Sequence, residues 1–276
     1  MSAPGEPRMT QALLDGSTRL HFIVGDPIAQ VKSPGGMSQA FAAQGRNALC
    51  VPAHVAPPQL ATWLAGVSLA QNVDGIIVTV PHKFACFELC ATASERARFL
   101  GAVNTLRRNP DGSWHGDMFD GLGYVQALRA KDCDPANKRA LLVGAGGAGS
   151  AIAHALVRAG VRELAIHDPD TQRRDSLIVR LASLGQAHIT VGSPQPQGFD
   201  IALNASPVGM QPQDPCPLDT GGFTPTLFVG CVITAPAVPP MIAAARAKGC
   251  PTMTGADMFA QVRELMLEFL LGTRNS

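Results

Sequence analysis

The spacing of apolar residues changes repeatedly along the chain between short continuous runs and helical periodicity. Short apolar runs predict buried strands, whereas apolar residues three and four positions apart predict helices that cover them. Strands that alternate with helices are typical of α/β proteins. In the first half of the chain, the predicted strands cover 20–25, 48–55 and 75–80, and the predicted helices cover 36–44, 58–71 and 84–98.

The second half follows a polar, turn-rich stretch at 131–138. Residues 139–160 contain a strand, a glycine turn and a helix in immediate succession. At the end of the chain, 256–271 is predicted to be a helix, because its apolar residues share one face. Further strands are predicted at 163–167, 199–203 and 226–232.

These elements predict an α/β protein with two lobes and a ligand cleft between them. The first lobe covers 18–121 and takes in the C-terminal segment 254–276, and the family resemblance given below implies that it binds a small-molecule substrate. The second lobe, 122–253, is expected to be a Rossmann-type nucleotide-binding domain.

Composition narrows the class of partner and the compartment. Of the 276 residues, 46% are apolar and 16% are charged, with a net charge of +1, so a large core is expected and nucleic acid is not an expected partner. No apolar run is long enough for a membrane helix, and the first residues do not resemble a secretory signal. Seven scattered cysteines fit reduced thiols in the cytoplasm, and no metal site is expected.

The glycine turn fits a dinucleotide-binding loop. Gly144, Gly146 and Gly149 match GxGxxG directly after a strand and open a helix, with Gly147 and Ala148 between them. The first glycine permits a tight turn, and the second lets the backbone approach a pyrophosphate at the helix N-terminus. The alternative is a structural turn that binds no ligand.

The residues at the end of the next strand indicate which nicotinamide nucleotide binds. Asp168 follows Gly149 at about the spacing of an acid that accepts the ribose hydroxyls of NAD, and His167 precedes it. A carboxylate would repel the 2′-phosphate of NADP, and Pro169 supplies no arginine beside it. NAD is therefore expected and NADP is the less favoured cofactor. Asp168 as a simple helix cap remains an alternative.

A lysine follows the strand 75–80 after a proline, in VTVPHK. The cation is either a solvated surface group or a base at the edge of the cleft. VTVPHK, GAVNTL (101–106), GDMFDG (116–121), GAGGAG and NASPVGM (204–210) occur in this order. Together they resemble the shikimate/quinate dehydrogenase family over nearly the whole chain.

The resemblance implies an NAD(P)-dependent oxidoreductase, acting on a ring hydroxyl of shikimate, quinate or a related carboxylic acid, as in aromatic amino acid biosynthesis. It assigns proton transfer to Lys83 and Asp120 and leaves open which of them is the base. A monomer or homodimer is expected. The resemblance also implies substrate contacts from Ser33, Thr79, Asn104 and Gln261, and cofactor contacts from Asn204, Ser206 and Met210.

The chain departs from the family pattern on the substrate side. Val31 stands where a carboxylate-binding hydroxyl is usual, and Ile77 replaces an asparagine. Phe119 beside Asp120 is expected to narrow the pocket. Thr234 falls nearest a usual tyrosine, while Gln261 competes with its neighbour Val262 for the last substrate contact. An altered ring acid that is bulkier, less hydroxylated or held differently is therefore expected.

Two other functions stay open at this point. A non-catalytic NAD-binding sensor would need the glycine turn but not Lys83 with Asp120. A methylene-folate-type dehydrogenase shares a lysine base on a similar plan, but AVNT and GDMFDG favour the shikimate/quinate resemblance.

Overall fold

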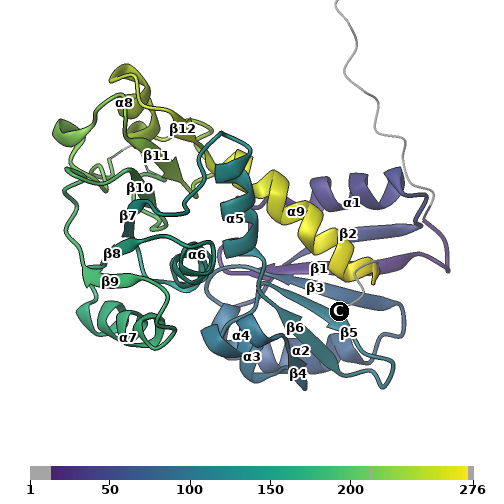
Figure 1. The fold of residues 1–276 in the computed structure, drawn as a ribbon. Helices are drawn as coiled ribbons and strands as arrows, with labels where there is room; N and C mark the ends of the chain where they lie inside the picture. Colours follow the sequence, from purple (N-terminus) through teal and green to yellow (C-terminus); the bar gives the residue numbers. More distant parts are fainter. Residues whose placement is uncertain (1–13, 212, 273–276) are drawn as a thin grey trace, which may run out of the picture.

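The computed structural model describes residues 14–211 and 213–272 and shows two α/β lobes (Figure 1). Residues 1–13, and residues 273–276 of the expected C-terminal segment, lie outside the described residues. Each lobe is built on one six-stranded sheet, so the predicted α/β class is confirmed.

The first lobe has a mixed sheet in the order β2-β1-β3-β5-β6-β4. Strands β1, β2 and β3 are parallel, whereas β5 is antiparallel to both β3 and β6. Its strands are β1 (Arg19–Gly25), β2 (Ala48–His54), β3 (Val73–Val78), β4 (Thr92–Ala93), β5 (Thr105–Arg108) and β6 (Trp114–Asp117), and its helices are α1 (Ser33–Ala43), α2 (Leu60–Ser68), α3 (Lys83–Glu88) and α4 (Glu95–Leu100).

The single helix predicted over 84–98 is wrong. The segment between α3 and α4 pairs with β6, where the backbone N–H of Ser94 donates to the carbonyl of Gly116 at 3.0 Å. Ser94 then caps α4 by accepting a bond from the N–H of Ala97. The apolar residues nevertheless keep a helix-like spacing from α3 to α4, because each short helix and β4 contributes buried residues.

The second lobe has a fully parallel sheet in the order β12-β11-β10-β7-β8-β9. The direction of winding changes between β7 and β10, and ligands of such sheets bind beyond the carboxyl ends of strands at that point. Its strands are β7 (Arg139–Val143), β8 (Glu163–His167), β9 (His188–Val191), β10 (Ile201–Asn204), β11 (Phe228–Cys231) and β12 (Thr252–Met253), and its helices are α6 (Gly147–Arg158), α7 (Thr171–Ala182) and α8 (Pro240–Ala247).

Two helices connect the lobes. Helix α9 (Gly255–Leu271) leaves the second lobe and crosses back to contact α1 and α5 (Asp120–Arg129), as predicted for the C-terminal helix (Figure 1). Its predicted apolar face is buried, from Met258 to Phe269. Helix α5 also packs on α6, so the proposed lobe boundary at 121–122 falls inside a helix that both lobes share.

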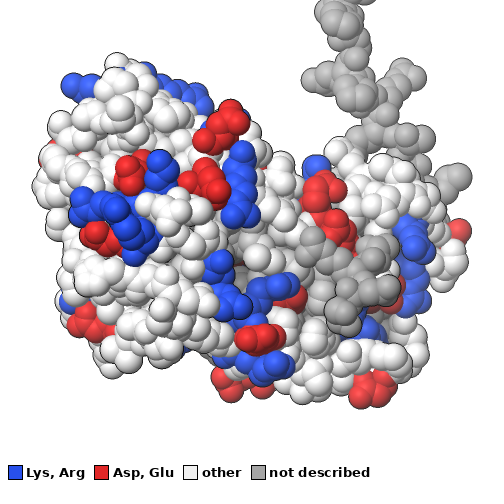
Figure 2. All heavy atoms as spheres, viewed as in Figure 1, with Lys and Arg blue, Asp and Glu red and all other residues white. Residues whose placement is uncertain are grey.

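The surface in Figure 2 carries interspersed charges, with lysines and arginines beside aspartates and glutamates. Several of these are ion pairs, such as Arg139 with Glu163. Among residues 14–211 and 213–272, no helix has the length and apolar character needed to cross a membrane.

Candidate active site

A lysine, an asparagine and an aspartate meet where three strands of the first lobe end or begin. Lys83 opens α3 shortly after β3, Asn104 immediately precedes β5, and Asp120 opens α5 shortly after β6. Because β3, β5 and β6 are neighbours in the sheet, these segments converge at one edge. The Lys83 Nζ donates to Asp120 Oδ2, and Asn104 Nδ2 donates to Asp120 Oδ1 at 2.7 Å.

This cluster is fixed and largely withdrawn from water. Asn104 is 2% exposed, and its side-chain oxygen accepts bonds from the Phe119 N–H at 3.0 Å and the Thr105 hydroxyl at 3.1 Å. The amide can therefore only present its N–H group to Asp120. The Lys83 and Asp120 side chains are 12% and 10% exposed, so they face a narrow opening. Such an arrangement holds an ammonium and a carboxylate ready beside a bound hydroxyl.

A cavity of about 220 Å³ opens onto the cluster and is lined from both lobes. Its lining combines polar side chains, among them Lys83, with a larger number of apolar ones. The lining residues are Ile23, Val31, Lys32, Ser33, Ile77, Val78, Thr79, Lys83, Asn104, Asp120, Ala148, Val232, Thr234, Gly255, Met258, Phe259, Val262 and Met266.

The structure brings most of the predicted substrate residues to this cavity. Ser33 and Thr79 line it beside the cluster. Gln261 does not: the next residue, Val262, supplies the lining from α9. A shift of one residue turns a helical side chain by about 100°, which explains why the sequence left these two in competition.

Phe119 does not narrow the cavity, contrary to expectation. Its ring is 1% exposed and packs on Phe269, with ring centroids 5.2 Å apart, and under the Arg96 guanidinium at 4.9 Å. Met118 is likewise buried in the core rather than in the lining. These two residues belong to the packing behind Asp120 and place no atoms in the cavity.

The glycine turn fits a bound nucleotide. Gly144 has φ +101°, and a side chain on Gly149 would lie 1.9 Å from the Gly144 carbonyl oxygen, so both positions require glycine. A Cβ on Gly146 would meet nothing within 4 Å, so the backbone is open on that side at the start of α6. Backbone N–H groups and the dipole of a helix N-terminus attract a pyrophosphate at such a place.

The turn also lies next to the cluster of Lys83, Asn104 and Asp120. A Cβ on Gly147 would be 3.2 Å from Lys83 Cδ, and Ala148 lines the cavity. The residues expected for cofactor and chemistry therefore come together across the junction of the two lobes.

Asp168 holds the glycine turn in place. Its carboxylate is buried and accepts bonds from the N–H of Ala145 at 2.7 Å and from Arg173 Nη2 at 2.7 Å. Burial raises the pKa of Asp168, but the bonds from Arg173 and Ala145 outweigh it and lower the pKa below 3.8. The carboxylate is therefore ionised near neutral pH. Asp170, not Asp168, caps α7, which sets aside the alternative reading of Asp168 as a helix cap.

Arg173 was not predicted to take part here. The sequence places it a turn after Asp168, but α7 folds back so that its first turn faces the end of β8. The short spacing between the end of β8 and the capped start of α7 is the feature of the sequence that could have predicted this ion pair. His167 contributes its carbonyl, which accepts the Gly144 N–H at 2.8 Å.

The loop after β10 is built around Asn204. Its side-chain oxygen accepts bonds from the Ser206 N–H at 3.0 Å and the Ser206 hydroxyl at 2.6 Å. Asn204 is fully buried, so it shapes the loop, while Met210 is 36% exposed at the surface. None of the three lines the cavity, which the second lobe reaches through Val232 and Thr234.

A parallel sheet with a glycine turn, joined to a lobe that presents Lys83, Asn104 and Asp120, defines a two-lobed nicotinamide-dependent dehydrogenase. Residues 23–106 match the shikimate dehydrogenase substrate binding domain, and residues 133–177 match the ThiF family. Shikimate dehydrogenase (NADP(+)) of Rubrobacter xylanophilus is 35% identical over 91% of this chain and 89% of its own. The chain belongs to the shikimate dehydrogenase family.

Solved structures support the same family assignment. Shikimate 5-dehydrogenase from Listeria monocytogenes, in complex with shikimate and NAD, has a TM-score of 0.85 and 25% identity and covers 94% of each chain. The 5-ketofructose reductase of Gluconobacter sp. strain CHM43 has a TM-score of 0.81 and 27% identity and covers 92% of this chain and 93% of its own. The chain is thus an NAD(P)-dependent dehydrogenase of the shikimate/quinate family, which takes a small-molecule substrate and a nucleotide.

Proposed function

We propose that this dehydrogenase interconverts a ring hydroxyl and a ring ketone on shikimate, quinate or a related hydroxylated ring carboxylic acid. The observation that carries the proposal is the cluster of Lys83, Asn104 and Asp120 at the cavity, directly beside the glycine turn. Residues 18–121 with the C-terminal helix form the proposed substrate domain, and 122–253 the nucleotide domain. We expect a monomer or a homodimer.

Proton transfer falls to Lys83 and Asp120. When an alcohol is oxidised, its carbon loses a hydride and its oxygen loses a proton. A bound nicotinamide supplies the hydride acceptor. Because Lys83 and Asp120 are joined by a hydrogen bond, either group can receive the proton that leaves the substrate oxygen. The proton then passes to solvent through the narrow opening that both side chains face. Asn104 keeps the carboxylate facing the cavity by donating to its other oxygen.

The wall opposite the cluster favours a ring acid with fewer hydroxyls. Val31, Ile77 and Val262 present hydrocarbon to the cavity and cannot donate or accept hydrogen bonds. A substrate hydroxyl facing them would lose its bonds to water without replacement, which costs about 1–3 kcal/mol for each group. Lys32 and Ser33 lie on the lining and are the groups available for the carboxylate.

For the cofactor we propose NAD. Two carboxylates, Asp168 and Asp170, stand at the end of β8, where the adenosine ribose of a nucleotide on the glycine turn would lie. Their charge opposes a 2′-phosphate. Arg173 is a nearby group that favours NADP, but its guanidinium is already paired with Asp168. Relatives in the family are named for NADP, so this choice needs its own measurement.

The test replaces Lys83 with methionine, which keeps the length of the side chain without the charge. Turnover is followed as absorbance of reduced nicotinamide with shikimate, quinate and ring acids of fewer hydroxyls, using NAD and NADP in turn. We expect a loss of about 10²–10⁴-fold in kcat with nucleotide binding retained. The exposed lysine 248, changed to methionine, is the control. Undiminished turnover in Lys83→Met would contradict the proposal, and absence of turnover in the parent would point to a binding protein.

A further inference from the structure

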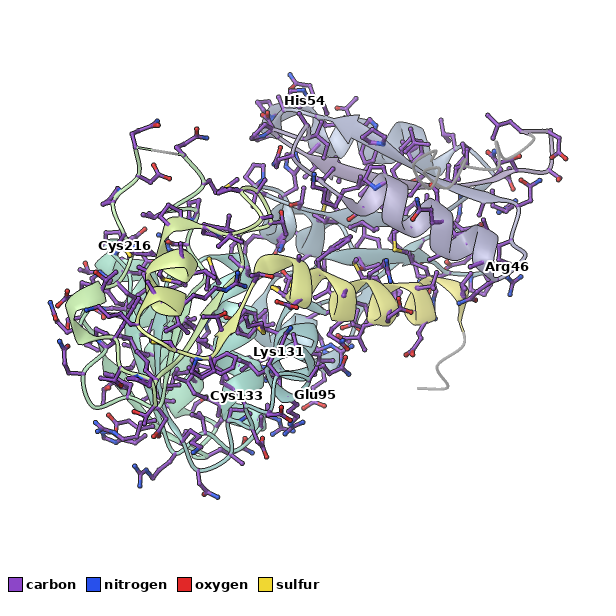
Figure 3. All side chains as sticks on the ribbon, turned by 90° about the horizontal axis from the view of Figure 1, so that it is seen from above. Arg46, His54, Glu95, Lys131, Cys133 and Cys216 are labelled. Atoms are coloured by element: carbon purple, nitrogen blue, oxygen red, sulfur yellow. The ribbon has the colours of Figure 1, made fainter. Side chains whose placement is uncertain are left out.

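A second cavity lies away from the cluster of Lys83, Asn104 and Asp120, at the outer end of the first lobe. It measures about 650 Å³ and is lined by the starts of β1 and β2, by β5 and by the end of α9. Figure 3 shows Arg46 at this end of the lobe, near the end of α9 and far from Cys216 of the second lobe. None of its lining residues lines the active-site cavity.

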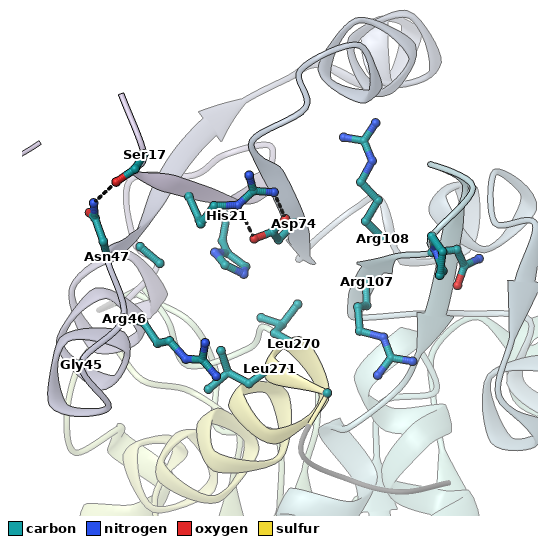
Figure 4. A pocket seen from close by; sticks show the side chains of 15 residues that line it. Ser17, His21, Gly45, Arg46, Asn47, Asp74, Arg107, Arg108, Leu270 and Leu271 are labelled. Carbon is teal, nitrogen blue, oxygen red and sulfur yellow. Dashed lines mark hydrogen bonds and ion pairs between the residues drawn. The ribbon is translucent and has the colours of Figure 1, made fainter. Parts of the chain in front are cut away.

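A buried histidine points into this second cavity with nothing to bond. His21 is 2% exposed, and neither ring nitrogen has a hydrogen-bond partner among the described residues. One face of the ring packs on Phe41, with centroids 4.4 Å apart, and Figure 4 shows the ring directed toward Leu270. Unpaired nitrogens in the interior destabilise a protein, so native structures seldom leave them without a ligand or a water molecule.

The lining around His21 carries an excess of positive charge. Arg19, Arg46, Arg107 and Arg108 line the cavity, against the single carboxylate of Asp74. Asp74 is already paired with Arg19, with Nε to Oδ2 at 2.8 Å. The other three arginines therefore have no carboxylate partner among the described lining residues, although Figure 4 shows the Arg108 guanidinium turned away from Arg46.

Two of these three arginines are held rigidly. Arg107 donates to the carbonyl of Phe269 at 3.2 Å and lies over its ring at 4.8 Å. Arg108 donates to the carbonyls of Ala70 and Val73 at 2.7 and 3.2 Å. The neutral carbonyls accept hydrogen bonds from the two guanidinium groups but do not neutralise their positive charge. A guanidinium with remaining donors binds carboxylate or phosphate well.

The third arginine is free to move. The Arg46 backbone bonds Phe41 and Ala48, but no hydrogen bond or ion pair joins its exposed side chain to another described residue. In Figure 4 it stands on one side of Leu271, with Arg107 on the other side and His21 above. Arg46 can therefore close on a ligand that Arg107 and His21 already face.

We propose that this second cavity binds a compact dianion, a phosphate or a dicarboxylate, between Arg46, Arg107 and His21. Burial lowers the pKa of His21 to about 4, so the ring is neutral near neutral pH and keeps one N–H. Both ring nitrogens are closed to solvent, so the side chains around the ring must shift for that N–H to reach an anion oxygen. The guanidinium groups supply the charge. This inference is independent of the substrate and the cofactor of the dehydrogenase.

The experiment records the ¹⁵N signals of the histidine rings in the full-length protein during titration with inorganic phosphate. His21→Phe identifies the His21 signal by its loss and fills the same space beside Phe41. We expect a saturable shift of the His21 signal with phosphate, and none with chloride at equal ionic strength. Succinate in a parallel titration tells whether the natural anion is of the phosphate or the carboxylate type.

Affinity is compared in two arginine variants. Arg46→Gln is expected to weaken phosphate binding by about tenfold, since it removes one charged hydrogen bond. Arg246→Gln, an exposed arginine of the second lobe whose Nε bonds Thr252, is the matched control and should bind as the parent does. No saturable shift with either anion, or equal binding by the Arg46 variant and the parent, would overturn the proposal. Because Arg46 is exposed, this test does not depend on the folding of His21→Phe.

Discussion

The two sides of the active-site cavity differ in chemistry. On one side, Lys83, Asn104 and Asp120 are joined by hydrogen bonds and fixed by the backbone around them. Elsewhere in the lining, Val31 and Val262 present hydrocarbon. Groups that move protons must be held to a fraction of an ångström, whereas a wall that recognises substrate can change by single substitutions. The contrast suggests retained redox chemistry with altered substrate recognition.

The same contrast separates the two lobes. The glycine turn permits little change, because a side chain at Gly149 would collide with the backbone of Gly144. The substrate lobe contributes most of its cavity through side chains of β3, α1 and α9, which no backbone constraint fixes. A family with this architecture can therefore vary its substrate while keeping the glycine turn.

After Lys83→Met, the largest expected effect comes from a second change among the bonded polar residues. Asp120→Asn keeps the shape but removes the charge that faces Lys83, so kcat should fall about 10–100-fold with folding retained. The assay is nicotinamide reduction at saturating cofactor. Asp117→Asn is the control, since Asp117 is also buried and bonded to Arg96 but lies outside the cavity. Equal losses in the two variants would mean that Asp120 acts through stability alone.

The second effect concerns the nucleotide. Asp168→Asn keeps an acceptor for the Ala145 N–H, and Pro169→Arg adds a cation beside the ribose site. Together they should shift the ratio of kcat/KM for NADP over NAD by about tenfold or more toward NADP. Asp168→Asn alone serves as the control for the loss of charge. An unchanged ratio in the double variant would place the ribose away from Asp168.

The third effect converts part of the apolar wall to a polar one. Val31→Ser adds a hydroxyl next to Ser33 and should raise kcat/KM for shikimate or quinate by about fivefold, through one added hydrogen bond. The exposed Val179→Ser should leave it unchanged. If Val31→Ser gives no gain, the substrate carboxylate is bound elsewhere.

The smallest effect tests how the apolar wall is supported. At the start of α9, Asp257 accepts bonds from Thr254 and pairs with Lys131. Burial raises the pKa of Asp257, but these bonds outweigh it and lower the pKa below 3.8. The stabilisation is therefore present above the unfolded-state pKa and is lost as pH falls through the lower folded-state value.

Asp257→Asn should reduce the free energy of unfolding by about 0.5–1 kcal/mol at neutral pH. Chemical denaturation of both proteins should show that the difference disappears in acid, where Asp257 is protonated in the parent as well. A difference that persists in acid would assign the effect to packing rather than to charge.

The sequence predicts best those elements that have a regular spacing of apolar residues or a local turn motif. The glycine turn, the parallel sheet around it and the helix that ends in Leu271 follow from periodicity and local chemistry. The segment 84–98 was mispredicted, because its apolar spacing does not show that residues near Ser94 pair with a strand distant in the chain. That pairing is a long-range contact without a local signal.

The candidate site also contains residues that local motifs predict and residues whose placement depends on tertiary packing. Lys83 and Asp120 follow from ordered motifs, and the structure brings them into contact. Whether Gln261 or Val262 faces the cavity depends on the rotation of α9, which tertiary packing sets. The ion pair of Arg173 with Asp168 likewise depends on the angle at which α7 leaves β8.

The most direct test of the contrast compares kcat/KM for shikimate with that for 3-hydroxycyclohexanecarboxylate, a ring acid with a single hydroxyl, in the unmodified protein with NAD. If the apolar wall governs recognition, the singly hydroxylated acid should be used at least as well as shikimate. Preference for shikimate by about tenfold or more, equal to 1.4 kcal/mol, would contradict the account.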